Sequence, residues 1–131
     1  MEHVLTLPFK RPPMSANDQR RAHWAVQAKA KKQVGDATYL AARQQNITNL
    51  RPSTVGCKWF TPDKRRRDVD SLYPFLKAVL DGLVHAGVFI DDHCGWVVET
   101  RTAIDMTDMK NPRIEVRIKE IEEEQPACLA A

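Results

Sequence analysis

Basic and acidic side chains meet in one short stretch near the middle of the chain. Three arginines at positions 65–67 run directly into Asp68 and Asp70, and a second acidic pair, Asp91 and Asp92, follows further along. Carboxylates repel one another, so a fold seldom gathers several of them without a cation that neutralises their charge. Arginines beside such a cluster favour an anionic partner, and a phosphodiester held between a divalent metal and basic side chains meets both conditions. The pattern therefore predicts a metal-dependent nuclease.

The two acidic pairs and Lys77 are the residues expected to carry this chemistry. In an extended segment Asp68 and Asp70 point to the same side, and a helix beginning just after Asp70 would place Lys77 close to two turns further on. Carboxylate oxygens suit Mg²⁺, which would polarise a phosphate and lower the pKa of an attacking water, while Lys77 would stabilise developing negative charge. Three interpretations without a metal site stay open. Asp68 and Asp70 could be a chance pair of loop acids, Lys77 and Asp81 could form only an i,i+4 ion pair, and the second acidic pair could be turn residues.

The distribution of charge supports a nucleic-acid partner more than its total does. A chain of 131 residues with 43% hydrophobic and 28% charged residues is typical of one soluble globular domain, and the net charge of +3 is only mildly basic. The cations concentrate in the first third of the chain and around the acidic motif, whereas the end of the chain is acidic. We expect a domain over residues 1–120 and a disordered acidic and Ala-rich tail over residues 121–131. The basic residues expected to contact DNA are Arg20, Arg21, Lys29, Lys64, Arg65, Arg66 and Arg67.

Hydrophobic periodicity predicts the elements that must position these residues. The clearest is an amphipathic helix over residues 71–86, with Ser71 as its N-cap and Gly87 as its C-terminal cap. A second helix is expected from Ser15 or Asn17 to Arg43, with a possible break at Gly35, and with His23 and Trp24 packed in the core or contacting DNA. Strands are expected at residues 4–8 (at a sheet edge), 54–60, 95–103 and 113–121. The order β-α-β-α-β-β predicts an α+β domain in which a small mixed sheet packs with two main helices.

The cysteines and the hydropathy suggest where the protein works. Cys57, Cys94 and Cys128 are odd in number and far apart, so they show neither a disulfide framework nor a zinc pattern, and free thiols fit a reducing cytoplasm. No stretch approaches the ~20 apolar residues of a membrane span. We therefore expect a cytoplasmic protein without a membrane partner.

The acidic motif and its surroundings resemble the RusA family of Holliday-junction resolvases, which are common in phages and prophages. The likeness extends over roughly residues 4–120, and Pro13-Met14-Ser15-Ala16-Asn17, followed by His23-Trp24, is similar to the opening of that family. Its central segments are Arg66-Arg67-Asp68-Val69-Asp70-Ser71-Leu72, Leu76-Lys77-Ala78-Val79-Leu80-Asp81-Gly82-Leu83 and Ala86-Gly87-Val88-Phe89-Ile90-Asp91-Asp92.

The resemblance implies a homodimeric, Mg²⁺-dependent endonuclease, with Mn²⁺ as a substitute, that nicks four-way DNA junctions symmetrically in the cytoplasm of a host cell. It implies that Asp68, Asp70 and Asp92 are catalytic metal ligands, with Asp91 in reserve as the third carboxylate, and that Lys77 is the essential lysine. The chain departs from the family pattern in two ways. Ser71 stands where the family often has Asn, and the spacing from Asp70 to Lys77 is a few residues longer.

Three other functions fit the same residues. A less selective structure-dependent nuclease shares the chemistry, a branched-DNA-binding protein without catalysis shares the basic surface, and a protein-interaction module would need neither. Salt-dependent affinity for DNA separates the first two from the last.

Overall fold

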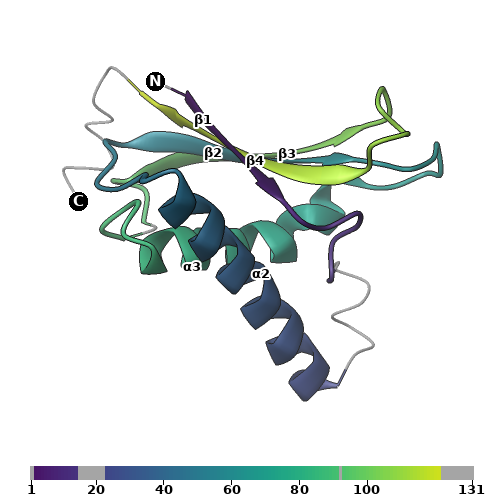
Figure 1. Cartoon of the computed structure of the whole chain (residues 1–131), viewed down its shortest axis with the longest axis horizontal. Coiled ribbons are helices and arrows are strands. Elements are labelled where there is room, and N and C mark those ends of the chain that lie inside the picture. Colours follow the sequence, from purple (N-terminus) through teal and green to yellow (C-terminus); the bar gives the residue numbers. More distant parts are fainter. Residues whose placement is uncertain (1, 15–22, 92, 122–131) are drawn as a thin grey trace.

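A mixed four-stranded sheet carries both helices of the fold on one face (Figure 1). The structure is a computed structural model and describes residues 2–14, 23–91 and 93–121. Its element order confirms the expected α+β class with a small mixed sheet and two main helices. The elements are β1 (Glu2–Leu7), α2 (Trp24–Gln44), β2 (Ser53–Phe60), the 3-10 turn η1 (Val69–Leu72), α3 (Tyr73–His85), β3 (Val97–Asp105) and β4 (Arg113–Glu120).

The sheet has the strand order β1-β4-β2-β3, so β1 is an edge strand as expected. The neighbours β2 and β3 run parallel, whereas β4 is antiparallel to both β1 and β2. A parallel pair needs a crossover, and here α3 supplies it. Ser53 N–H donates to Trp96 O at 2.8 Å where β2 and β3 begin, and Thr61 N–H donates to Asp105 O at 3.0 Å where both end. The loop that leaves β2 therefore starts at an end of the sheet where β2 and β3 are still hydrogen-bonded to each other.

The helix α3 confirms the hydrophobic pattern over its length. Its apolar stripe is buried against the core at Phe75, Leu76, Val79, Leu80 and Leu83. Gly87 ends the helix with φ +82°, its N–H donating to Val84 O while Val88 N–H donates to Leu83 O, both at 3.0 Å. These two bonds form a Schellman motif, and a φ in that range favours glycine.

The start of α3 corrects one expectation. Ser71 does not cap the helix, because the chain first makes the separate turn η1 and the N-cap position falls on Leu72, which has no side-chain cap bond. The Ser71 hydroxyl instead donates to the carbonyl of Asp68 at 2.6 Å. Short polar side chains often bond to nearby backbone in this way and so compete with regular helix.

The helix α2 begins at Trp24 within the described residues, with the Nδ1 of His23 accepting from Ala25 N–H at 3.2 Å. The expected start at Ser15 or Asn17 lies outside the described residues. The helix does not break at Gly35, which lies where α2 crosses α3. Its first half extends beyond the sheet (Figure 1), and Trp24 is 73% exposed, so the expected core packing of this residue is wrong.

Among the described cysteines, Cys57 has a free, buried thiol and Cys94 is disulfide-bonded. The expectation of free thiols is therefore correct for Cys57 and wrong for Cys94. Within the described residues, no helix has the length and apolar character required to cross a bilayer. Residues 122–131 lie outside the described part, and the expectation of a disordered tail stays a prediction.

Candidate functional site

The loop between β2 and η1 is held by its own side chains before it reaches the acidic motif. Thr61 is fully buried, and its hydroxyl donates to Asp63 O at 2.9 Å. Arg67 donates to the Asp63 carboxylate at 2.7 Å and to the carbonyl oxygens of Asp63 and Arg65 at 3.2 Å each. The same guanidinium lies over the Trp59 ring, 4.7 Å from its centroid, a cation–π geometry. These contacts fix the backbone that leads into Asp68.

Asp68 and Asp70 both face solvent at the start of η1. Asp68 occupies the N-cap position with extended backbone (φ −96°, ψ 135°), yet its carboxylate makes no capping bond; only its carbonyl accepts, from Ser71. Both acids are exposed, and no residue of the described segments pairs with either carboxylate. Carboxylate oxygens are ligands of the kind that Mg²⁺ prefers. The expectation that Asp68 and Asp70 point to the same side assumed an extended segment, whereas Asp70 lies in η1, so that alternation does not apply to the pair.

Lys77 lies on the exposed side of α3, where its Nζ is 3.3 Å from Asp81 Oδ1. Both side chains are about two-thirds exposed (64% and 65%), so solvent screens this ion pair and leaves it weak. The expected alignment of Asp70 with Lys77 assumed one continuous helix. Since Asp70 belongs to η1 and Lys77 to α3, helical spacing alone does not align them.

The second acidic pair follows the far end of α3. Gly87 and Val88 accept backbone bonds from Asn49 and Leu50, which lie just before β2 begins. Asp91 comes three residues later and is exposed, whereas Asp68 and Asp70 precede the other end of α3. A helix of 13 residues is about 20 Å long. Within the described residues no three His, Cys, Asp or Glu side chains form a group able to hold a metal, so Asp91 does not join Asp68 and Asp70. Asp92 lies outside the described residues.

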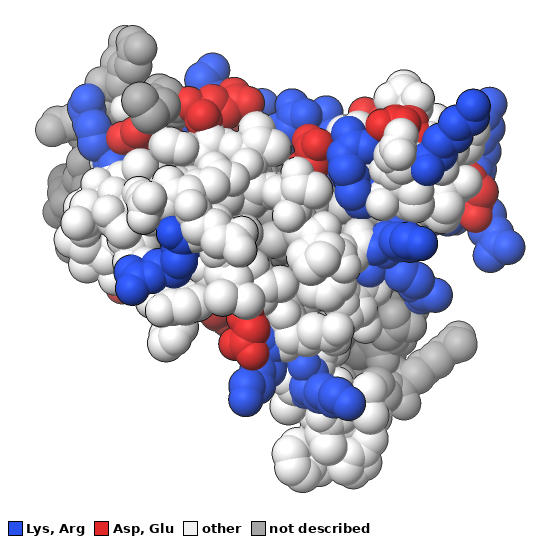
Figure 2. Space-filling view, in the orientation of Figure 1, with Lys and Arg blue, Asp and Glu red and all other residues white. Residues whose placement is uncertain are grey.

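The basic residues expected to contact DNA differ in where they lie and in how far they are exposed. Arg20 and Arg21 lie outside the described residues, and Lys29 is exposed on the projecting half of α2. Lys64, Arg65 and Arg66 are exposed in the loop after β2. Arg67 differs from them, because only 15% of its side chain is exposed and its guanidinium is bound within the loop. On the face drawn in Figure 2, much of the basic surface gathers toward the end of the sheet where β2 and β3 finish.

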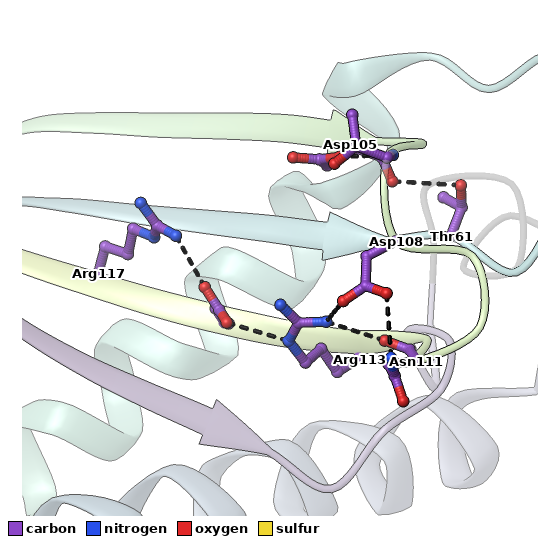
Figure 3. Close-up of polar contacts among 8 residues, drawn as sticks. Thr61, Asp105, Asp108, Asn111, Arg113 and Arg117 are labelled. Carbon is purple, nitrogen blue, oxygen red and sulfur yellow. Dashed lines mark hydrogen bonds and ion pairs between the residues drawn. The ribbon is translucent and has the colours of Figure 1, made fainter.

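A polar network that the sequence did not reveal stiffens this end of the sheet (Figure 3). Arg113 is 2.8 Å from Asp108 and 3.0 Å from Glu115, and its guanidinium carbon lies 3.8 Å from the centroid of the Phe60 ring. Burial alone would raise the pKa of Glu115, but hydrogen bonds from Arg117 and Arg113, together with their charges, lower it. The spacing of Arg113, Glu115 and Arg117 on alternate positions of β4 is the one sequence signal that they share a face.

The fold and the site thus define a small α+β domain with an exposed acid pair beside a basic loop. No protein-family model matches the chain, and neither does any curated protein.

Proposed function

We propose that this protein is a Mg²⁺-dependent endonuclease that cuts branched DNA, a RusA-type resolvase that acts as a homodimer on four-way junctions. The single observation that carries the proposal is the position of Asp68 and Asp70. These unpaired carboxylates follow directly on an arginine-rich loop that is fixed at the end of a sheet. Oxygen ligands for a metal and cations for a DNA backbone therefore lie on one continuous surface segment.

Each residue has a distinct role in the proposed reaction. Asp68 and Asp70 would hold the metal, and Asp92 would supply the third carboxylate. When bound, Mg²⁺ lowers the pKa of a water molecule and polarises the phosphate. Lys77 leaves its weak pair with Asp81 to stabilise negative charge on the phosphate, since an exposed ion pair is exchanged at little cost. Lys64, Arg65 and Arg66 hold the DNA backbone against the site.

The test compares Asp70→Asn with the wild-type chain on a synthetic four-way junction in Mg²⁺. The substitution keeps the shape of the side chain but removes a charged ligand, so we expect cleavage to fall by at least about 100-fold, the scale of losing one electrostatic group in an active site. Binding to the junction, measured in Ca²⁺, should change by less than about threefold because the cations are retained.

Glu2→Gln is the matched control, since Glu2 is an exposed acid at the end of the sheet where β2 begins, opposite to the end that leads into the acidic motif. It should cut at the wild-type rate. Undiminished cutting by Asp70→Asn would refute the catalytic assignment. Equal cutting of junctions, flaps and linear duplex would instead identify a less selective nuclease.

One observation favours a second function, the binding of branched DNA without catalysis. Within the described residues, no three His, Cys, Asp or Glu side chains form a group able to hold a metal. A protein of this kind would shift a four-way junction with or without Mg²⁺ and would never cut it. Single-turnover assays with excess protein distinguish slow cutting from none.

A further inference from the structure

A recess of about 370 Å³ opens beside the acidic motif, at the end of β2. Four arginines reach it from two distant parts of the chain. Three belong to the loop before Asp68, while Arg11 belongs to the segment after β1. The lining residues are Arg11, Trp59, Pro62, Asp63, Arg65, Arg66 and Arg67.

Two contacts bring Arg11 to this place. The indole N–H of Trp59 donates to the carbonyl of Lys10 at 3.0 Å, and this bond holds the segment against the end of β2. Phe9 packs edge-on against Phe75 of α3, with ring centroids 6.0 Å apart. Pro12 is buried on the other side of Arg11. Arg11 is therefore held over the end of the sheet by its neighbours, while its own side chain stays exposed.

The recess carries a large excess of positive charge. Four arginines against one aspartate give a net charge of +3 (4 − 1). The Asp63 carboxylate is already engaged, at 2.7 Å from Arg67 and 3.6 Å from Arg65. Within the described segments no acidic side chain pairs with Arg11 or Arg66. Two guanidinium groups therefore face the recess with their charge available to an anion.

We propose that this recess binds a phosphate of the DNA backbone other than the one that is cut, with Arg11 and Arg66 as its contacts. Guanidinium groups match phosphate geometry with paired hydrogen bonds and keep their charge at every physiological pH. The volume is larger than a single ion requires, which suits a phosphate that arrives with its sugars. The recess adjoins Asp68, so a phosphate held there would set the register of the strand at the acidic motif. This inference rests on the proposed function in naming DNA as the ligand.

The test measures how junction binding depends on salt, in Ca²⁺ so that nothing is cut. Each phosphate contact that is lost should reduce the slope of log K against log salt by about 0.9. We expect that reduction for Arg11→Ala and for Arg66→Ala, and about twice that reduction for the double variant. Arg51→Ala is the matched control, because Arg51 is an exposed arginine at the opposite end of β2. It should leave the slope unchanged.

A direct titration separates this inference from the proposed function. Inorganic pyrophosphate added to the full chain should shift the indole N–H resonance of Trp59 in wild type and not in the double variant. If both arginine variants bound DNA normally and kept the wild-type slope, the recess would not be a phosphate site. The proposed nuclease function would not be affected by that result. A pyrophosphate shift without any affinity for DNA would refute DNA as the ligand, and with it the nuclease. Equal pyrophosphate shifts in wild type and the double variant would overturn the assignment of Arg11 and Arg66.

Discussion

Arg67 and Asp63 form the shortest ion pair in the loop that precedes the acidic motif, with Nη2 2.7 Å from Oδ1. The pair is local, four residues apart, but the Arg67 guanidinium also lies over Trp59 of β2. The Arg67 side chain thus ties the loop to the sheet. An arginine that the sequence suggests as a DNA contact has a structural role.

Replacing Arg67 by Ala should destabilise the fold, whereas replacing its exposed neighbour should not. The change removes a charge-assisted hydrogen bond and a cation–π contact, and we expect the free energy of unfolding to fall by about 1–3 kcal/mol. Arg67→Lys should fail to restore it, because a single ammonium cannot bond three acceptors in the same plane. Urea unfolding measures both variants. Arg66→Ala is the control, with a change within about 0.5 kcal/mol. Equal stability losses at the two positions would contradict the structural role of Arg67.

The same pair predicts how stability changes with pH. The hydrogen bond from Arg65 N–H lowers the pKa of Asp63, and the bond from the Arg67 side chain lowers it further. A depressed pKa means that the unfolded chain binds more protons as the pH falls, so the contribution of Asp63 is present above the unfolded value, near 3.9, and is lost as pH falls through the folded value.

Asp63→Asn should therefore be less stable than wild type at pH 7, and the difference should shrink as the pH falls below about 3.9, the unfolded value. Urea midpoints collected across this range provide the measurement, with Asp36→Asn as the control that should track wild type. A gap between Asp63→Asn and wild type that stays constant with pH would show that Asp63 acts through its shape and not its charge.

The crossing of the two helices predicts opposite effects at two glycines. A Cβ on Gly82 would lie 2.7 Å from the carbonyl oxygen of Gly35 and 2.9 Å from the Cβ of Thr38. Backbone cannot give way as a flexible side chain can, so Gly82→Ala should push α3 away from α2 and lower the free energy of unfolding by about 1–3 kcal/mol. Urea unfolding of the variant measures this loss.

Gly35→Ala is the matched comparison on the facing helix. The nearest atom to its added Cβ is the Ala78 carbonyl oxygen at 3.9 Å, an ordinary contact. Alanine favours a helix interior over glycine by up to about 1 kcal/mol, so this variant should be more stable than wild type. If both variants lost stability alike, the close approach at Gly82 would not be the cause.

Local patterns were sufficient to predict most of the fold. The stripe that buries Phe75, Val79 and Leu83 is set by spacing along one helix, and Gly87 ends that helix because a positive φ suits glycine. The sequence also indicated β1 as an edge strand through the prolines that follow it.

What the sequence could not show depends on contacts between distant segments. The approach of Gly35 to Gly82 turns an apparent helix breaker into a packing site. Arg11 joins the arginine loop only because Trp59 and Phe75 hold the segment around it, 54 residues before Arg65 along the chain (65 − 11). Trp24 is likewise exposed because α2 extends beyond the sheet. The hydrophobic periodicity of a helix does not predict how far that helix projects from its neighbours.

Burial of Cys57 in the middle of β2 predicts an unreactive thiol. Burial raises its pKa to about 12, and its side chain is only 2% exposed. The thiolate is the reactive form, so iodoacetamide at pH 8 should leave Cys57 unmodified in the native protein and alkylate it fully in 8 M urea, as peptide mapping would show. A raised pKa also means that the unfolded chain ionises first at alkaline pH. The stability contributed by the neutral thiol is therefore complete below about pH 8.5 and declines above it. Cys57→Ala should remove that alkaline decline, although its smaller side chain lowers stability at every pH. Rapid native labelling at pH 8 would show that β2 opens far more readily than its position in the sheet implies.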